Sequence, residues 1–265
     1  MDDLKVLFED THYFAIDKPS GLLVHPSPIE RRAPNAVALM REQFGFKAYT
    51  VHRLDRPTSG VLIFAKSSEA AHRLNLCFAQ REVQKTYLCV CRGYTEEQGT
   101  IDYPLKEILD KVADKMANPD KPAKEAVSDY RRLATVELPI PVGKYPASRY
   151  SLVEVKPKTG RKHQIRRHLK HLSHPLIGDT KHGDGRHNLL FREHFGLDRL
   201  LLMATQLTFV HPFTGQPVTI NAPVTAWVDE LFSQFGWQGL YPAPTLPQQE
   251  AESVLPPNVM EAASC

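Results

Sequence analysis

The chain has 265 residues and a mass of 30.0 kDa, which suits one large domain or two small ones with a sizeable buried core. Its hydrophobic share of 42% and charged share of 24% are ordinary for a soluble globular protein and argue against a disordered or fibrous chain. The net charge of +3 is only mildly basic, so the total charge does not by itself indicate a nucleic-acid partner.

Segments that would direct the chain to a membrane or across one are not visible in the sequence. No apolar run approaches the length of a membrane span, and the N-terminus lacks the basic start and apolar core of a secretory signal. The four cysteines show neither the spacing of a disulfide framework nor a Cys-x-x-Cys pair. We therefore expect a reduced, cytoplasmic protein without a structural zinc site.

The N-terminal half alternates between short strands and capped helices. Two strands are predicted at 6–10 and 13–16, and Asn35 is placed to cap a helix that ends near Gly45. The apolar run 61–65 predicts a buried strand, and Ser67 is placed to cap a helix that reaches about residue 80. Further strands are predicted at 85–93, 127–136, 149–155, 200–209 and 218–220, and helices at 161–172 and 227–235.

Two segments differ in composition from the rest. Residues 106–146 begin rich in Lys and Asp and contain several prolines, which predicts a variable excursion that either grips RNA or has no role. Residues 239–265 contain five prolines and few large apolar residues, so we expect a disordered tail. The remaining 1–238 would form the folded domain.

The stretch His52–Gly60 carries a carboxylate on a loop that runs directly into the buried strand 61–65. Its Pro-Thr-Ser-Gly sequence is typical of a rigid turn, and the flanking Arg53 and Arg56 favour the charged form of Asp55. Taken alone, such an aspartate is better explained by turn capping than by catalysis.

Residues 161–171 contain no acidic side chain and are mostly Arg, Lys and His. Ile165, Leu169 and Leu172 recur at helical spacing, which predicts a helix with one buried stripe and a basic exposed face. Such a face is often merely solvated, but a helix start after a Thr-Gly turn also attracts phosphate through its free N–H groups. The histidines here and at His174 and His182 lack a metal-binding spacing, and the adjacent cations would repel a metal ion, so we expect none.

Three segments in this order, Asp17–Pro26, His52–Gly60 and Thr159–Arg166, resemble the motifs of the RluA-type pseudouridine synthase family. The first reads Lys-Pro-x-Gly-Leu-x-Val-His-Pro, the second His-Arg-Leu-Asp followed by Thr-Ser-Gly, and the third Thr-Gly-Arg-x-His-Gln-Ile-Arg. The resemblance implies an α+β fold whose mixed, mostly antiparallel sheet is flanked by helices and loops. It also implies a catalytic domain over 1–238 without an N-terminal accessory RNA-binding domain.

The resemblance also implies roles for particular residues. Asp55 would be the catalytic residue, Tyr87 would pack on the target base, and Arg166 would form an ion pair with Asp55. The loop that ends at Asp179 would support the wall of the active site. The residues expected to contact RNA are Arg53, Arg56, Arg161, Lys162, His163, Arg167 and Lys170.

The implied reaction is the isomerisation of a uridine in RNA to pseudouridine, which requires neither a metal nor a nucleotide cofactor. Residues 55–60, 114–115, 154–168 and 233–237 most resemble members that modify uridine 65 of tRNA, so tRNA is the expected partner of a protein that we expect to be monomeric. Another uridine in tRNA or rRNA, and a non-catalytic RNA-binding protein, are the alternatives. A glycoside hydrolase would need a second carboxylate near Asp55. Whether Asp55 attacks the sugar or base, or abstracts a proton, is left open.

Overall fold

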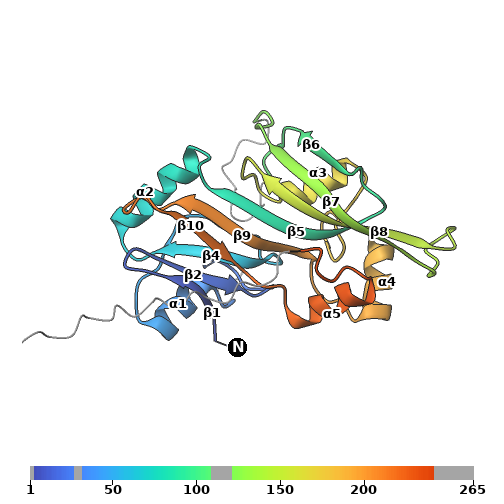
Figure 1. The fold of residues 1–265 in the computed structure, drawn as a ribbon, viewed down its shortest axis with the longest axis horizontal. Helices are drawn as coiled ribbons and strands as arrows, with labels where there is room; N and C mark the ends of the chain where they lie inside the picture. Colours follow the sequence, from blue (N-terminus) through green and yellow to red (C-terminus); the bar gives the residue numbers. More distant parts are fainter. Residues whose placement is uncertain (1–2, 27–31, 109–120, 242–265) are drawn as a thin grey trace, which may run out of the picture.

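The computed structural model describes residues 3–26, 32–108 and 121–241. Within these ranges a ten-stranded sheet runs through the molecule in the order β1-β2-β4-β9-β5-β8-β7-β6, with β10 beside β9 and β3 beside β4 (Figure 1). All the pairs among described strands are antiparallel except β4 with β9. The expected α+β fold with a mixed, mostly antiparallel sheet is therefore confirmed.

The strands are β1 (Lys5–Glu9), β2 (Tyr13–Lys18), β3 (Tyr49–Thr50), β4 (Ser59–Ala65), β5 (Gln84–Arg92), β6 (Gln98–Asp102), β7 (Val127–Leu138), β8 (Ser148–Pro157), β9 (Leu202–Val210) and β10 (Pro217–Asn221). The helices are α1 (Ala36–Phe44), α2 (Ser68–Ala79), α3 (Gln164–His171), α4 (Gly185–Phe195) and α5 (Ala226–Gln234).

The first two helices begin where their capping residues predict. The side chain of Asn35 accepts a hydrogen bond from the backbone N–H of Ala38 at 3.0 Å, and Ser67 does the same for Ala70 at 3.1 Å. These bonds satisfy N–H groups that have no partner within the first turn. Helix α1 ends at Gly45, whose φ of 73° is a left-handed conformation that glycine adopts without strain.

The helices cover both faces of the sheet, as the alternation along β5 shows. Leu88 and Val90 pack in a cluster with residues of α4 and α5, whereas Cys89 and Cys91 pack in a cluster with residues of α3. Successive strand residues point to opposite faces, so α3 lies across the sheet from α4 and α5. Tyr87 contacts both the α3 cluster and the cluster that contains α1 residues. The α1 and α3 clusters therefore meet at Tyr87 on one face of the sheet.

A single row of residues aligns three strands at this meeting point. Ala204 of β9 pairs with Tyr87 of β5 on one side and with Gly60 of β4 on the other. Gly60 has a φ of 107°, and a Cβ there would lie 2.1 Å from the carbonyl oxygen of Ala204, so only glycine permits this approach. The row fixes the start of β4, and hence the loop that carries Asp55, beside Tyr87.

Several local features differ from the sequence expectations or add to them. Helix α3 starts at Gln164 rather than Arg161, and α4 was not predicted. Strand β7 lies inside the expected excursion, yet it pairs with β8 and is part of the sheet. Tyr241, expected in the tail, is buried against Phe232, while 242–265 lie outside the described residues. No helix among the described residues is long and apolar enough to cross a membrane.

Candidate active site

The loop that carries Asp55 is fastened to the first strands by a buried lysine. The backbone N–H of Thr58 donates to the carbonyl of Asp55 at 3.0 Å, which closes the turn. The ammonium of Lys18 donates to the carbonyl of Arg56 at 3.1 Å and also to those of Pro19 and Leu22. Burial lowers the pKa of Lys18 to about 7, with the nearby charge of Arg199 adding to the effect. These contacts hold the backbone around Asp55 in one conformation.

Arg166 joins two carboxylates that are far apart in the sequence. Its Nη1 donates to Oδ2 of Asp55 at 3.1 Å, while Nε and Nη2 donate to the two oxygens of Asp179 at 2.7 and 2.8 Å. The Arg166 side chain is 3% exposed and that of Asp179 is fully buried, whereas the Asp55 side chain remains 18% exposed. A fork of this kind fixes the guanidinium rigidly, so Arg166 presents its third nitrogen, Nη1, to the accessible carboxylate.

Asp179 is the residue that sets this geometry. Burial by itself would raise the pKa of Asp179, but hydrogen bonds from Arg166 and from the backbone N–H groups of His182 and Lys181 outweigh it and lower the pKa below 3.8. The two N–H groups donate to Oδ1, each at 2.9 Å. The resemblance placed Asp179 in a supporting loop, but its direct pairing with Arg166 was not foreseen, because neither spacing nor periodicity connects the two residues.

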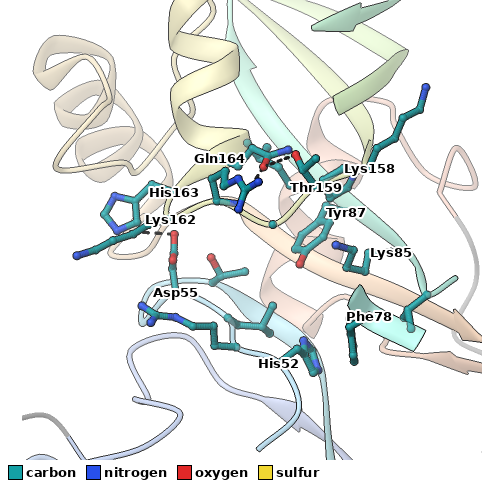
Figure 2. A pocket seen from close by; sticks show the side chains of 18 of the residues that line it. His52, Asp55, Phe78, Lys85, Tyr87, Lys158, Thr159, Lys162, His163 and Gln164 are labelled. Atoms are coloured by element: carbon teal, nitrogen blue, oxygen red, sulfur yellow. Dashed lines mark hydrogen bonds and ion pairs between the residues drawn. The ribbon is translucent and has the colours of Figure 1, made fainter. Parts of the chain in front are cut away.

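A cleft of about 620 Å³ opens above these residues and is lined by Asp55, Tyr87 and Arg166. Figure 2 shows the hydroxyl end of Tyr87 and the carboxylate of Asp55 reaching into the same space from β5 and from the loop before β4. Burial, with the charge of Asp55 nearby, raises the pKa of Tyr87 above its ordinary value, so the phenol stays neutral. The three residues expected to be catalytic therefore face a shared cleft.

The residues expected to contact RNA divide into two groups. Arg53, Arg161, Lys162 and His163 line the cleft, whereas Arg56, Arg167 and Lys170 do not. The structure thus gathers four of the seven expected residues around Asp55. Lys85 and Lys158 also line the cleft, although neither was among the residues expected to contact RNA.

Two residues outside the cleft have other contacts. Arg56 donates from Nε to the carbonyl of Gly21 at 2.9 Å, and Arg167 donates from Nη1 to the carbonyl of Lys106 at 2.9 Å. Both contacts tie loops to their neighbours. That these two arginines bind RNA stays a prediction.

The polar residues of α3 are less exposed than a solvated basic face requires. Gln164 is buried and links the loop after β8 to the start of β7, because its Oε1 accepts from Thr159 and its Nε2 donates to the carbonyl of Val127. His168 is fully buried, with Nδ1 3.1 Å from Oγ of Ser128. The helix therefore buries polar side chains at its first residue and in its middle, where they act as structural links. Hydrophobic periodicity cannot reveal this, since it scores such residues as exposed.

Histidines near the site do not assemble into a metal centre within the described part of the chain. No group of three or more His, Cys, Asp or Glu side chains there lies close enough to hold a metal ion. His163 and His182 instead contact each other through Nδ1 and Nε2 at 2.8 Å.

His52 should make the free energy of unfolding depend on pH. Burial, with Lys85 nearby, lowers the pKa of His52 to about 3, and its bare Nε2 accepts a hydrogen bond from the backbone N–H of Ile63 at 3.0 Å. The unfolded chain would bind a proton near the ordinary value of 6.5. Between these two pKa values the unfolded state holds more protons, so the free energy of unfolding should fall as the pH is lowered through this window.

Urea unfolding at about pH 7.5 and about pH 5 measures this effect in the wild type and in His52→Gln. The amide oxygen of glutamine still accepts the Ile63 bond but does not titrate, so the variant should lose less stability on acidification. The comparison between the two proteins also removes the contribution of His163, whose pKa burial lowers to about 4. Equal losses in both proteins would contradict the assignment to His52.

Known proteins resemble this chain in sequence and in fold. The family described as RNA pseudouridylate synthase matches residues 12–171. A protein of Vibrio cholerae named tRNA pseudouridine synthase C is 52% identical over 236 residues, which are 89% of this chain and 97% of that protein. One of the same name from Salmonella typhi is 50% identical over 240 residues, 90% of this chain and 92% of that protein.

Among solved structures, the chain is similar to human RNA pseudouridylate synthase domain containing 1. The TM-score is 0.65 at 22% identity, with 91% of this chain and 97% of that chain covered. Human RNA pseudouridylate synthase domain containing 4 gives a TM-score of 0.64 at 24% identity, with 88% and 93% covered. At these identities the likeness supports the fold.

Proposed function

The chain belongs to the RNA pseudouridylate synthase family, and we propose that it isomerises a uridine of tRNA to pseudouridine. The observation that carries the choice of tRNA is the identity of 52% over 89% of the chain to a protein named tRNA pseudouridine synthase C. The finer proposal of uridine 65 rests on the resemblance of residues 55–60, 114–115, 154–168 and 233–237 to members that act at this position. Residues 114–115 lie outside the described part of the chain.

The reaction moves the uracil ring from one attachment to another. The bond between N1 of the base and C1′ of the ribose breaks, the ring turns, a bond forms from C5 to C1′, and the proton on C5 is lost while N1 gains one. Nothing is oxidised and no group leaves the RNA, so the residues must chiefly hold the ring and move protons. Asp55 is the carboxylate among the described residues that line the cleft, and it is accessible.

This arrangement favours pseudouridine formation over simple hydrolysis of the glycosidic bond. A hydrolase of the two-carboxylate type needs a second acid about 5–9.5 Å from the first. The other charged side chains on the described cleft wall are cations, among them Arg53, Lys85 and Lys162. Arg166 compensates the charge of Asp55, which allows one carboxylate to work in a partly enclosed site.

A base within a helical stem must leave its stack to reach Asp55, at a cost of about a few kcal/mol. Phosphate contacts from the cations of the cleft wall offset this cost. Arg53 lies two residues before Asp55 and is exposed. Its planar side chain with five donors is suited to contact the RNA where the base has left.

Tyr87 is proposed to support the flipped uracil through its ring. Tyr87→Ala should lower kcat/KM by about 5- to 150-fold, because stacking of a base on an aromatic ring contributes about 1–3 kcal/mol. Tyr87→Phe keeps the ring and isolates the contribution of the hydroxyl. If Tyr87→Phe were impaired as strongly as Tyr87→Ala, the hydroxyl rather than stacking would be the important feature, and the proposed role would be wrong.

Mapping of pseudouridine in tRNA tests the proposed function and position together. Cells with and without this protein are compared at every uridine, and a plasmid copy of the gene is returned to the deletion strain. We expect the modification at position 65 to disappear and to return with the plasmid. Loss at another tRNA position would retain the activity and reject the site, whereas loss only in rRNA would reject tRNA as the substrate.

A further inference from the structure

His163 and His182 form a hydrogen-bonded pair at the edge of the cleft, and none of the roles above depends on this contact. Nδ1 of His163 lies 2.8 Å from Nε2 of His182, and the rings are nearly perpendicular. The other nitrogen of His163, Nε2, lies 3.9 Å from Oδ2 of Asp55, and its side chain is 9% exposed. Figure 2 shows the ring of His163 directly beside the carboxylate of Asp55.

The backbone of His163 adopts an energetically unfavourable conformation. Its φ of 57° is a left-handed conformation that is uncommon for a residue with a side chain, and at the start of α3 its side chain makes no capping bond. Capping is the usual reason for a polar residue at this position, so another interaction must account for the direction of the ring. The contact with His182 is that interaction.

The position of His182 is in turn set by the carboxylate that holds Arg166. The backbone N–H of His182 donates to Oδ1 of Asp179 at 2.9 Å, and the same carboxylate accepts the fork of Arg166. Asp179 therefore places both neighbours of Asp55, Arg166 directly and His163 through His182. A disturbance at His182 would reach Asp55 without touching the ion pair.

We propose that His182 is a positioning residue that donates its Nε2–H to Nδ1 of His163, so that His163 presents Nε2–H to Asp55 and to the nucleotide bound against it. This rests on the proposed function for the identity of the ligand, but the direction of the hydrogen bond is a property of the protein alone. In the opposite arrangement a lone pair of His163 would face the Asp55 carboxylate. Two electron-rich atoms in that position repel each other, which favours the proposed direction.

Both rings are neutral near pH 7. Burial lowers the pKa of His163 to about 4 against the opposing effect of Asp55, and burial also lowers the pKa of His182. Six charged groups surround the pair. The loop before β4 contributes Asp55, helix α3 contributes Arg166, Arg167 and Lys170, and the loop after α3 contributes Asp179 and Lys181. Four of these six groups are cations, which disfavour protonation of the imidazoles. Each neutral ring therefore carries one N–H proton, either on Nδ1 or on Nε2.

Long-range proton–nitrogen NMR of the histidine rings answers that question in the full-length protein without substrate. The signals of His163 are assigned by their loss in His163→Gln. We expect the wild type to carry the His163 proton on Nε2, with Nδ1 unprotonated. A proton on Nδ1 of His163 would overturn the proposal, whether or not the protein modifies tRNA, so this result is separate from any failure of the proposed function.

Kinetics of His182 variants test the consequence. His182→Ala removes the donor and should lower kcat about tenfold with little change in KM, while His182→Gln, whose amide N–H replaces Nε2–H, should stay within about threefold of the wild type. In His182→Ala the freed Nδ1 binds a proton more readily, so the acid limb of the kcat profile should move to higher pH. The exposed His194 on α4 provides the control His194→Ala, which should alter neither.

A merely structural role predicts a different pattern. It would lower the unfolding temperature and the amount of active protein, but would leave the pH profile of the remaining activity unchanged. An unchanged acid limb in folded His182→Ala, or equal losses in His182→Ala and His182→Gln, would therefore overturn the proposal.

Discussion

Asp55→Asn should reduce conversion of uridine by about 10²- to 10⁴-fold, the range typical of removing a group that transfers protons or attacks directly. The substitution is nearly isosteric, and asparagine can still accept the hydrogen bond from Arg166. The closure of the loop, the N–H of Thr58 donating to the carbonyl of residue 55, uses only the backbone. We therefore expect the variant to fold and to bind tRNA within a few-fold of the wild type.

Two separate assays make this prediction decisive. Binding is measured by titration of labelled tRNA, and chemistry by single-turnover conversion with enzyme in excess. Conversion at the wild-type rate would show that Asp55 is not the reacting group. Loss of conversion and of binding in equal measure would instead place Asp55 in RNA recognition.

Arg166→Lys should be the second most damaging change, although it keeps the positive charge. Arg166 makes three charge-assisted hydrogen bonds to two carboxylates, and the single ammonium of lysine cannot reproduce a planar fork. Losing one such bond to Asp55 corresponds to about 10- to 150-fold in kcat. Because Asp179 is fully buried, an imperfectly paired carboxylate there should also lower the free energy of unfolding.

The pH dependence of the free energy of unfolding provides an independent test of the ion pair between Arg166 and Asp179. The pKa of Asp179 is lowered in the folded protein, so its contribution to stability is present above 3.8 and is lost as the pH falls below this value. Arg166→Lys should weaken that dependence. Arg192→Lys, at an exposed position on α4, is the matched control and should change neither activity nor stability. If both lysine variants behaved alike, the forked geometry would have no special importance.

Much of the architecture follows from local patterns in the sequence. Asn35 and Ser67 cap the helices that they were expected to cap, and the apolar run at 61–65 forms the buried strand β4. The left-handed Gly45 ends its helix as expected. These features depend on interactions within a few residues, which is why composition and periodicity predict them.

The contacts that organise the site join residues far apart in the chain. The resemblance to a family suggested that Arg166 faces Asp55, at a separation of 111 residues, but the fork to Asp179 and the pairing of His163 with His182 came only from the fold. No periodicity links a helix to the loop that follows it in this way.

Burial of polar groups was the other feature that the sequence concealed. Gln164, Arg166 and His168 read as part of an exposed basic face, yet all three are buried. Each is hydrogen-bonded to a neighbouring loop or strand, which makes its burial tolerable. A polar residue on a helix indicates exposure only when no neighbouring loop or strand offers it a hydrogen-bond partner. The sequence does not show which loops and strands will lie beside the helix.

Release of tritium from tRNA labelled at C5 of uridine reports on the proposed reaction itself, because formation of the C5 to C1′ bond expels the proton at C5. Purified protein is incubated with the labelled transcript and with a transcript in which uridine 65 is replaced by cytidine. We expect release of about one tritium per tRNA from the first transcript, none from the second, and none with Asp55→Asn. Absence of release from the first transcript, or the appearance of free uracil, would contradict it.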